Sequence, residues 1–150
     1  MRVVVQRVSE AGVEVDGKNI ASINEGILVL AAFRKGDSTA DLDWVARKCL
    51  RLRIFEDKNG KMNLSVLDME GGILVVSQFT LYGNCNKGRR PAYTESAPSH
   101  EAQELYREFI EIMSSYYPRV SEGAFGAKMK VKLVNDGPVT LIINRNKDIS

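Results

Sequence analysis

Residues 27–33 read Ile27-Leu28-Val29-Leu30-Ala31-Ala32-Phe33, an unbroken apolar stretch that follows a Glu25-Gly26 turn. A strand with one wet face alternates apolar and polar side chains, whereas a strand covered on both faces is apolar throughout. We therefore predict a central strand at residues 27–33, with other parts of the chain packed on both of its faces.

The segments before this stretch predict a β-hairpin. Residues 3–8 form a valine-rich run, and residues 13–15 alternate apolar and polar side chains up to Asp16-Gly17. Asp-Gly between two such segments is a strong signal for a tight hairpin turn. We expect residues 18–23 to form the return strand.

Two later segments change to helical spacing. Apolar side chains fall on one helical face at residues 41–50, where one of residues 37–39 can cap the first turn, and again at residues 99–117. Pro98 suits the start of the second helix, and Pro118 ends it. We expect the buried side of the first helix to include Cys49, since a free cysteine is usually a small core residue.

Further strands are expected around these helices. They lie at residues 52–55 (before an Asn59-Gly60 turn), 73–82, 129–133 and 139–143, with a turn at residues 135–138. Strands separated by two helices indicate one α/β domain over residues 1–150, with the helices layered on the sheet.

Composition excludes several classes of protein. The chain has 150 residues, 44% of them hydrophobic, and a formal charge of +2, which suits one globular domain and cannot coat a long nucleic acid. Two cysteines (Cys49 and Cys85) and one histidine (His100) cannot build the usual zinc sites, so we expect no metal and no cofactor. No segment resembles a signal peptide or a membrane span, which favours the cytoplasm.

The first candidate site is the polar end of the strand at residues 73–82. Ser77 and Phe79 would face one way along a strand, and Gln78 and Thr80 the other. These side chains could simply form hydrogen bonds at a sheet edge. A catalytic Ser or Thr nucleophile needs a base, and His100 at a predicted helix start is more easily read as a solvated residue. If this segment is catalytic, we expect its hydroxyl and amide groups to orient the reactants or stabilise an oxyanion in preference to acting as a nucleophile.

Two other segments carry candidate binding residues. Asn135-Asp136-Gly137-Pro138-Val139-Thr140 has ordinary turn composition, and nothing local predicts a cis bond before Pro138. If the bond were cis, two neighbouring carbonyls could grip an ammonium group. The loop at residues 83–98 holds Lys87, Arg89 and Arg90, which suit phosphate contacts, and Tyr93, a stacking face, although a solvated loop has similar composition.

Several motifs together resemble the D-aminoacyl-tRNA deacylases, the D-tyrosyl-tRNA deacylase family. The two signatures are Ser77-Gln78-Phe79-Thr80-Leu81-Tyr82 and Asn135-Asp136-Gly137-Pro138-Val139-Thr140, flanked by matches at residues 1–8, 52–57, 60–63, 87–91 and 125–127 and at Met129. One departure is Gly83-Asn84, where the family commonly has Ala-Asp.

The resemblance implies a three-layer α/β/β fold with mixed sheets and two main helices, acting as a homodimer on the acceptor end of aminoacyl-tRNA. The implied activity is hydrolysis of the D-aminoacyl ester, and of glycyl-tRNA. A cis Gly137-Pro138 pair of one subunit would enter the pocket of the other and reject L-amino acids, facing Ser77, Gln78, Phe79 and Thr80. The resemblance makes Phe125 and Met129 pocket residues and gives Arg7 the role of bracing the Gly-Pro loop.

Two questions stay open in the sequence. Thr80 is a candidate nucleophile in the family, but the lack of a base favours RNA-assisted catalysis with Thr80 in an orienting role. We also weigh two other classes of protein, a noncatalytic RNA-binding module using residues 87–90 and 128–132, and a thiol enzyme acting through Cys85. Neither accounts for both signatures.

Overall fold

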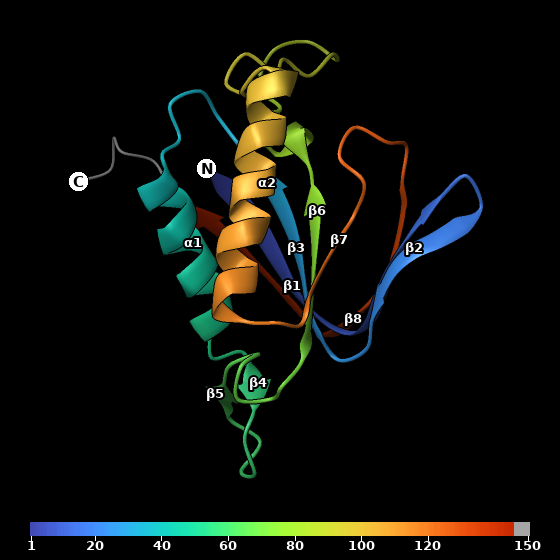
Figure 1. Cartoon of the computed structure of the whole chain (residues 1–150), viewed down its shortest axis with the longest axis vertical. Helices are drawn as coiled ribbons and strands as arrows, with labels where there is room; N and C mark the ends of the chain where they lie inside the picture. The colour runs from blue at the N-terminus through green and yellow to red at the C-terminus, as the bar shows by residue number, and fades with distance from the viewer. Residues whose placement is uncertain (146–150) are drawn as a thin grey trace.

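The predicted central strand, β3 (Gly26–Ala32), lies inside a six-stranded mixed sheet in a computed structural model, which describes residues 1–145 (Figure 1). The other elements are β1 (Arg2–Val15), β2 (Lys18–Ile23), α1 (Thr39–Arg51), β4 (Phe55–Glu56), β5 (Met62–Leu64), β6 (Gly72–Ser77), the 3-10 turn η1 (Phe79–Tyr82), α2 (Ser99–Tyr116), β7 (Val120–Glu122) and β8 (Lys130–Asn144). The strands run in the order β2-β1-β3-β6-β7, with β8 on the free edge of β1.

The long strand β1 connects the two halves of the sheet. Its residues 2–8 pair antiparallel with β3 and its residues 11–15 with β2, while β8 follows its other edge from Glu14 to Arg2. The predicted hairpin turn is confirmed, since Asp16 and Gly17 both have positive φ, at 51° and 76°. β3 and β6 pair in parallel, as do β6 and β7, and the connections between them carry α1 and α2.

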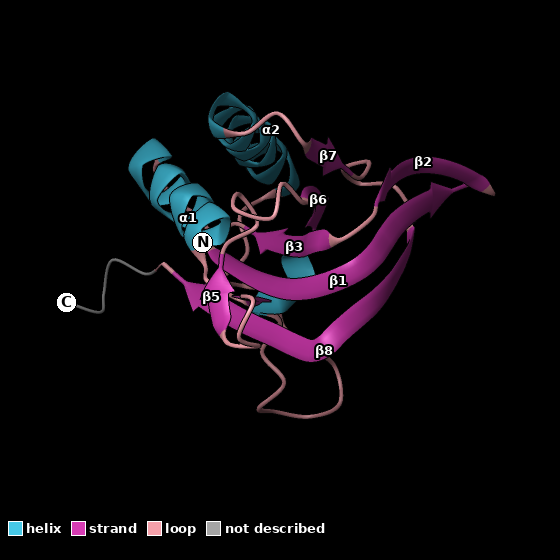
Figure 2. Cartoon of the chain, turned by 90° about the horizontal axis from the view of Figure 1, so that it is seen from below, coloured by secondary structure: helices cyan, strands magenta, loops and turns pink. Residues whose placement is uncertain are grey.

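Both helices cover one face of the sheet, side by side (Figures 1 and 2). The main apolar core lies between these two layers. Leu42 and Val45 of α1 and Phe109 and Met113 of α2 are fully buried there, as are Val3, Val5, Val29 and Val75 of the strands. Cys49 lies in this core as predicted, and burial raises its pKa to about 12.

A second apolar cluster lies on the other face of the sheet. It joins Val8 and Val13 of β1 and Ile23 of β2 to Leu28, Leu74 and Val76 of the central strands. The far half of β1, with β2 and β8, therefore curls back over the sheet and forms a third layer, so the predicted α/β fold with two helices is confirmed. Neither α1 nor α2 has the length and apolar character that a membrane crossing requires.

The strand predicted at residues 73–82 is too long. β6 stops at Ser77, which pairs with Ala31 next to the last residue of β3: Gln78 N still donates to Ala31 O at 2.7 Å, and the chain then turns into η1. The strand predicted at residues 52–55 is also wrong for most of its length, since only Phe55 belongs to a strand. The turn predicted at residues 135–138 lies inside β8, which keeps its pairing with β1 on both sides of it.

Candidate active site

A cavity of about 680 Å³ opens at the end of the sheet where β3 and β6 finish. Its lining includes five of the predicted site residues, Ser77, Gln78, Phe79, Phe125 and Met129. The start of α2 and the loop at residues 83–98 form the remaining wall. The parallel pair β3–β6 thus brings the first signature to the position where ligands bind in many open sheets, beyond the carboxyl ends of the strands.

The polar groups of the first signature lie at the rim of this cavity. Gln78 Nε2 donates to Thr80 Oγ1 at 2.5 Å, and both Thr80 and Phe79 are exposed. Thr80 itself is not among the described residues that line the cavity. His100, the chain's only histidine, lines a different cavity beside α2, so the Thr80 hydroxyl contacts an amide donor where a nucleophile would need a base.

The turn η1 is held in place by residues from other parts of the chain. Arg2 Nη1 donates to Leu81 O at 2.7 Å, and the Arg2 guanidinium stacks on the ring of Tyr82, 4.8 Å from its centroid. Burial of Tyr82 raises its pKa to about 12. Ser96 Oγ donates to the Phe79 carbonyl at 3.2 Å, a contact that no sequence pattern indicated.

Phe125 and Met129 form the opposite wall. The ring of Phe125 packs against Tyr106 with centroids 5.6 Å apart, and the Tyr106 hydroxyl donates to Val75 O at 3.0 Å. Burial raises the pKa of Tyr106, so it stays a neutral donor. A Cβ atom at Gly123 would lie 2.9 Å from Met129 Sδ, which shows how closely Met129 packs against the backbone there.

The second signature forms a bulge in β8. Asn135 is paired with Val8 and Thr140 with Gln6, so residues 136–139 project out of the ladder between them. Asn135 closes the bulge: its Oδ1 accepts from Val139 N at 2.8 Å and its Nδ2 donates to Thr140 Oγ1 at 2.9 Å. The Gly137–Pro138 peptide bond at the tip is cis, and both residues are exposed.

Arg7 braces this bulge from within the protein. It is only 7% exposed, and its Nε donates to Asp136 O at 2.8 Å while Nη1 donates to Ile54 O at 2.7 Å. A Cβ atom at Gly137 would lie 3.1 Å from Arg7 Nη2. The contact that the resemblance implied between Arg7 and the Gly-Pro loop is therefore present in the structure.

The cavity and the bulge are separate places in one chain. None of Arg7, Gly137 and Pro138 is among the described residues that line the cavity. The structure thus brings Ser77, Gln78, Phe79, Phe125 and Met129 together, and leaves the Gly-Pro pair exposed elsewhere. The expectation that a second copy inserts this pair into the cavity stays a prediction.

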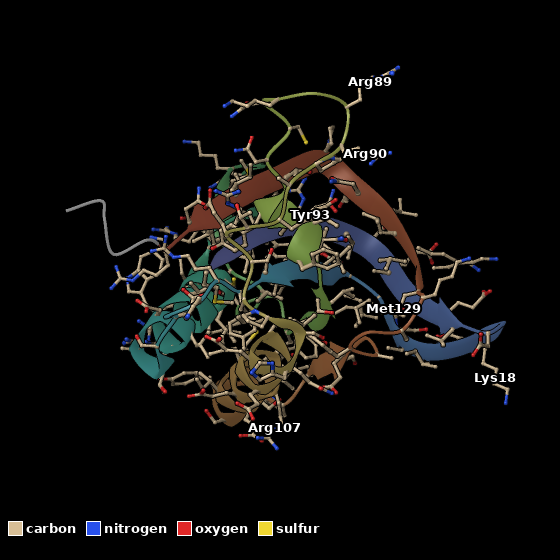
Figure 3. All side chains as sticks on the ribbon, turned by 90° about the horizontal axis from the view of Figure 1, so that it is seen from above. Lys18, Arg89, Arg90, Tyr93, Arg107 and Met129 are labelled. Atoms are coloured by element: carbon tan, nitrogen blue, oxygen red, sulfur yellow. The ribbon has the colours of Figure 1, made fainter. Side chains whose placement is uncertain are left out.

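Basic residues lie beyond the mouth of the cavity. Lys87, Arg89 and Arg90 are exposed, and Figure 3 shows Arg89 and Arg90 projecting from the loop while Tyr93 lies over the end of the sheet. Lys130 and Lys132 on β8 pair with Glu14 at 4.0 and 3.0 Å. The loop is therefore better suited than the lysine-bearing strand to offer positive charge to a phosphate.

The cysteines offer little chemistry at this site. Both are free thiols, with Cys49 buried in the core and Cys85 exposed on the loop. His100 lines a different cavity, and within the described residues the one hydrogen bond of Cys85 Sγ goes to the Gly83 carbonyl, at 4.0 Å. Within residues 1–145 no three His, Cys, Asp or Glu side chains are grouped as metal ligands.

Known proteins match the chain over nearly its whole length. A family model described as D-Tyr-tRNA(Tyr) deacylase matches residues 4–144. A D-aminoacyl-tRNA deacylase of Thermosipho africanus is 54% identical, covering 98% of this chain and 99% of its own. The corresponding protein of Geotalea uraniireducens is 55% identical, covering 99% of this chain and 96% of its own.

Solved structures agree on the fold. The c-Myc DNA Unwinding Element Binding Protein superposes with a TM-score of 0.93 at 40% identity, covering 97% of this chain and 99% of its own. A probable eukaryotic D-amino acid tRNA deacylase gives a TM-score of 0.81 at 20% identity, covering 95% and 97%, and so supports the fold alone. Because both the family model and relatives of more than half identity span almost every residue, the chain belongs to the D-Tyr-tRNA(Tyr) deacylase family.

Proposed function

We propose that this protein hydrolyses the ester bond between a D-amino acid and the terminal adenosine of tRNA, releasing free tRNA and the D-amino acid. The observation that carries the proposal is the cavity walled by Ser77, Gln78 and Phe79, which has a polar rim and an apolar interior but no histidine. The curated relatives bear the name D-aminoacyl-tRNA deacylase, which supports the same activity.

The site suits a reaction that needs positioning more than a strong nucleophile. An aminoacyl ester is already activated, so its hydrolysis requires less assistance than that of a peptide. The first backbone N–H groups of a 3-10 turn have no carbonyl partner within the turn, so those of Phe79 and Thr80 can donate toward the developing oxyanion. The 2′-hydroxyl of the terminal adenosine, or a water that it orients, supports attack on the ester carbonyl.

We assign the selection of D substrates to the exposed Gly137–Pro138 bulge, contributed by a second copy of this chain. The carbonyls of Gly137 and Pro138 would accept from the α-ammonium group and contact Cα–H, leaving space only for a side chain of D configuration. An L side chain would collide with backbone, whatever its chemistry. Glycine has no side chain to exclude, so glycyl-tRNA is accepted as well. The exposed bulge and its anchorage by Arg7 support this arrangement.

The acceptor end of tRNA docks on the basic loop. Lys87, Arg89 and Arg90 lie on the same loop as Tyr93, which lines the cavity, so phosphates near the ester fall within reach of these cations. The chain acts as a homodimer in this proposal, in the cytoplasm where tRNA is aminoacylated, and it needs no metal or cofactor.

One experiment tests the function against its rivals. Purified protein at low concentration is incubated with D- and L-aminoacyl-tRNA, and the Cys85→Ser variant is assayed in parallel. We expect rapid deacylation of the D substrate only, by both proteins. Binding of tRNA without deacylation would make the protein a noncatalytic nucleic-acid-binding module, and loss of activity in Cys85→Ser would make it a thiol enzyme.

A further inference from the structure

The structure assigns a positioning role to Tyr93, which holds the Phe79 ring at the mouth of the cavity, and identifies Gly83 as the position that makes room for it. The inference rests on the proposed function, because Phe79 belongs to the segment that would orient the ester. Tyr93 lies in the loop at residues 83–98, which the proposed mechanism otherwise uses only for phosphate contacts.

The two rings form an edge-to-face pair. The centroids of Phe79 and Tyr93 lie 5.1 Å apart with an interplanar angle of 65°, a favourable geometry for aromatic side chains. Both rings line the cavity, and they are 56% and 38% exposed. Phe79 begins the turn η1 with more than half of its surface exposed, and among the described residues Tyr93 is the aromatic ring that packs against it, so the Tyr93 ring restrains its rotamer.

The backbone of the loop holds Tyr93 in this position. Asn84 and Ala92 exchange two hydrogen bonds, at 2.8 and 3.0 Å, and Ser96 N donates to Tyr93 O at 3.1 Å. Ala97 N then donates to Phe33 O at 3.0 Å, which fastens the end of the loop to the sheet. Tyr93 therefore lies between two anchored points, and its position does not depend on the loop tip that carries the arginines.

Gly83 makes the close approach of Tyr93 sterically allowed. A Cβ atom there would lie 3.0 Å from Tyr93 Cε1 and 2.9 Å from Thr80 O, closer than side chains normally pack. The backbone of Gly83 has φ −63°, which any residue adopts, so the requirement for glycine is one of space. A side chain at this position would have to displace both the Thr80 carbonyl and the Tyr93 ring, and the ring would move away from Phe79.

Phe79 is thus restrained from two sides by one loop. Ser96 holds its carbonyl and Tyr93 holds its ring. Loss of the Tyr93 ring leaves the phosphate-binding side chains in place but lets the Phe79 ring turn among rotamers. Fewer bound substrates then have the ester aligned for attack, so the effect falls on kcat more than on KM.

The test compares Tyr93→Ala, Tyr93→Phe and Gly83→Ala in single-turnover and steady-state hydrolysis of D-tyrosyl-tRNA. We expect kcat to fall by about 3- to 10-fold in Tyr93→Ala with KM changed less than about twofold, as the loss of an aromatic pair predicts. Tyr93→Phe should keep wild-type kcat, because within residues 1–145 the Tyr93 hydroxyl makes no hydrogen bond. Tyr116→Ala is the matched control. Tyr116 is also an exposed tyrosine, but it lies at the C-terminal end of α2, whereas the cavity is lined by the N-terminal end, so this variant should leave kcat unchanged.

A double-mutant cycle tests the part played by Gly83. If Gly83→Ala acts by displacing Tyr93, its cost in kcat should shrink when Tyr93 is already alanine. Equal costs in both backgrounds would overturn the assignment of Gly83. Tyr93→Leu replaces Tyr93→Ala if the alanine variant does not fold, since leucine fills the space without providing an aromatic ring.

A measurement independent of catalysis separates this inference from the proposed function. The protein is labelled with 4-fluorophenylalanine, and the Phe79 signal among the five phenylalanines is assigned with Phe79→Leu. We expect Tyr93→Ala, but not Tyr93→Phe, to shift and broaden that fluorine signal. If wild-type protein fails to hydrolyse D-tyrosyl-tRNA but the signal behaves as expected, only the proposed function is lost. An unchanged signal, or a raised KM at unchanged kcat, would overturn the positioning role.

Discussion

Arg7 Nε donates a hydrogen bond to the backbone carbonyl of Asp136 across 2.8 Å, joining a nearly buried cation to the exposed bulge of β8. Among residues 1–145, the other side-chain hydrogen bonds that close the bulge come from Asn135. We expect Arg7→Lys to lower both the turnover of D substrates and the stability of the fold, because lysine keeps the charge but cannot reach both the Asp136 and Ile54 carbonyls.

The predicted outcome for Arg7→Lys is a fall of about 10-fold or more in D-aminoacyl-tRNA turnover, with a loss of stability of about 1–3 kcal/mol from the unpaired carbonyls. Urea unfolding and deacylation assays measure the two effects. Full activity together with reduced stability would show that the brace serves folding alone.

Thr80 provides the test of nucleophilic attack. Its hydroxyl accepts from Gln78 Nε2 and has no hydrogen bond to a base within residues 1–145, so we expect Thr80→Ala to keep substantial single-turnover activity. A substrate with a 2′-deoxy terminal adenosine should be resistant to the wild-type enzyme, provided that the RNA supplies the reactive group. Rapid quench measurements compare Thr80→Ala with the wild-type enzyme, and the 2′-deoxy substrate with the normal one. An inactive Thr80→Ala together with rapid hydrolysis of the 2′-deoxy substrate would restore Thr80 as the nucleophile.

Gly137 tests the geometry of chiral selection. Its φ of +143° disfavours any side chain, and a Cβ atom would lie 2.8 Å from Val139 Cγ2. We expect Gly137→Ala to lower D-substrate turnover by about 10-fold or more. Gly17→Ala is the matched control, since Gly17 also has a positive φ, +76°, but lies in the open hairpin turn. It should lose some stability and keep its activity.

The basic loop should govern the salt dependence of tRNA binding. Replacing Lys87, Arg89 and Arg90 by serine should raise KM for tRNA and reduce the slope of log K against log salt by about 2, at roughly 0.7–0.9 for each phosphate that is no longer neutralised. Hydrolysis of a D-aminoacyl-adenosine, which lacks those phosphates, should be unaffected. The control replaces Lys58 and Lys61 at the β4–β5 hairpin, which lies at the opposite end of the molecule (Figure 1).

Cys49 predicts a pH dependence of stability. Burial raises its pKa from 9.0 to about 12, so its stabilising contribution is complete below pH 9 and is lost as the pH rises toward 12. At pH 10 the wild type should have lost about 1 kcal/mol that Cys49→Ala does not lose, beyond a pH-independent packing difference. Urea unfolding at pH 7.5 and pH 10 measures this difference, with Cys85→Ser as the control for an exposed thiol.

Patterns in short stretches of sequence predicted the elements whose structure is set by residues close together in the chain. The Asp16-Gly17 turn and both helices follow from short-range geometry and apolar spacing, and the structure confirms them. The end of β6 could not be predicted, because Phe79, Leu81 and Tyr82 continue the apolar composition of the strand. The strand ends where the chain turns into η1, close to the end of β3, and contacts from Arg2 and Ser96 hold that turn, so its end depends on distant parts of the chain.

The candidate site also has features that the local sequence predicted and features that depend on tertiary contacts. The chemical types at residues 77–80 suggested a site, but their arrangement around a strand end and a 3-10 turn depends on tertiary contacts from Arg2 and Ser96. The contact of Arg7 with the second signature came from the resemblance and not from any spacing, because 129 residues separate Arg7 from Asp136.

The ladder between β1 and β8 also shows how much chain the bulge consumes. Val8 faces Asn135 and Gln6 faces Thr140, so a regular ladder would place a single residue opposite Arg7 where this protein places residues 136–139. The surplus at this point is three residues of β8, but the register shifts back by one between Val8 and Glu10, where Ser9 of β1 has no partner, so the net surplus is two residues. Pairing resumes on both sides of the loop, so the edge strand β8 carries the projecting residues 136–139 and stays part of the sheet.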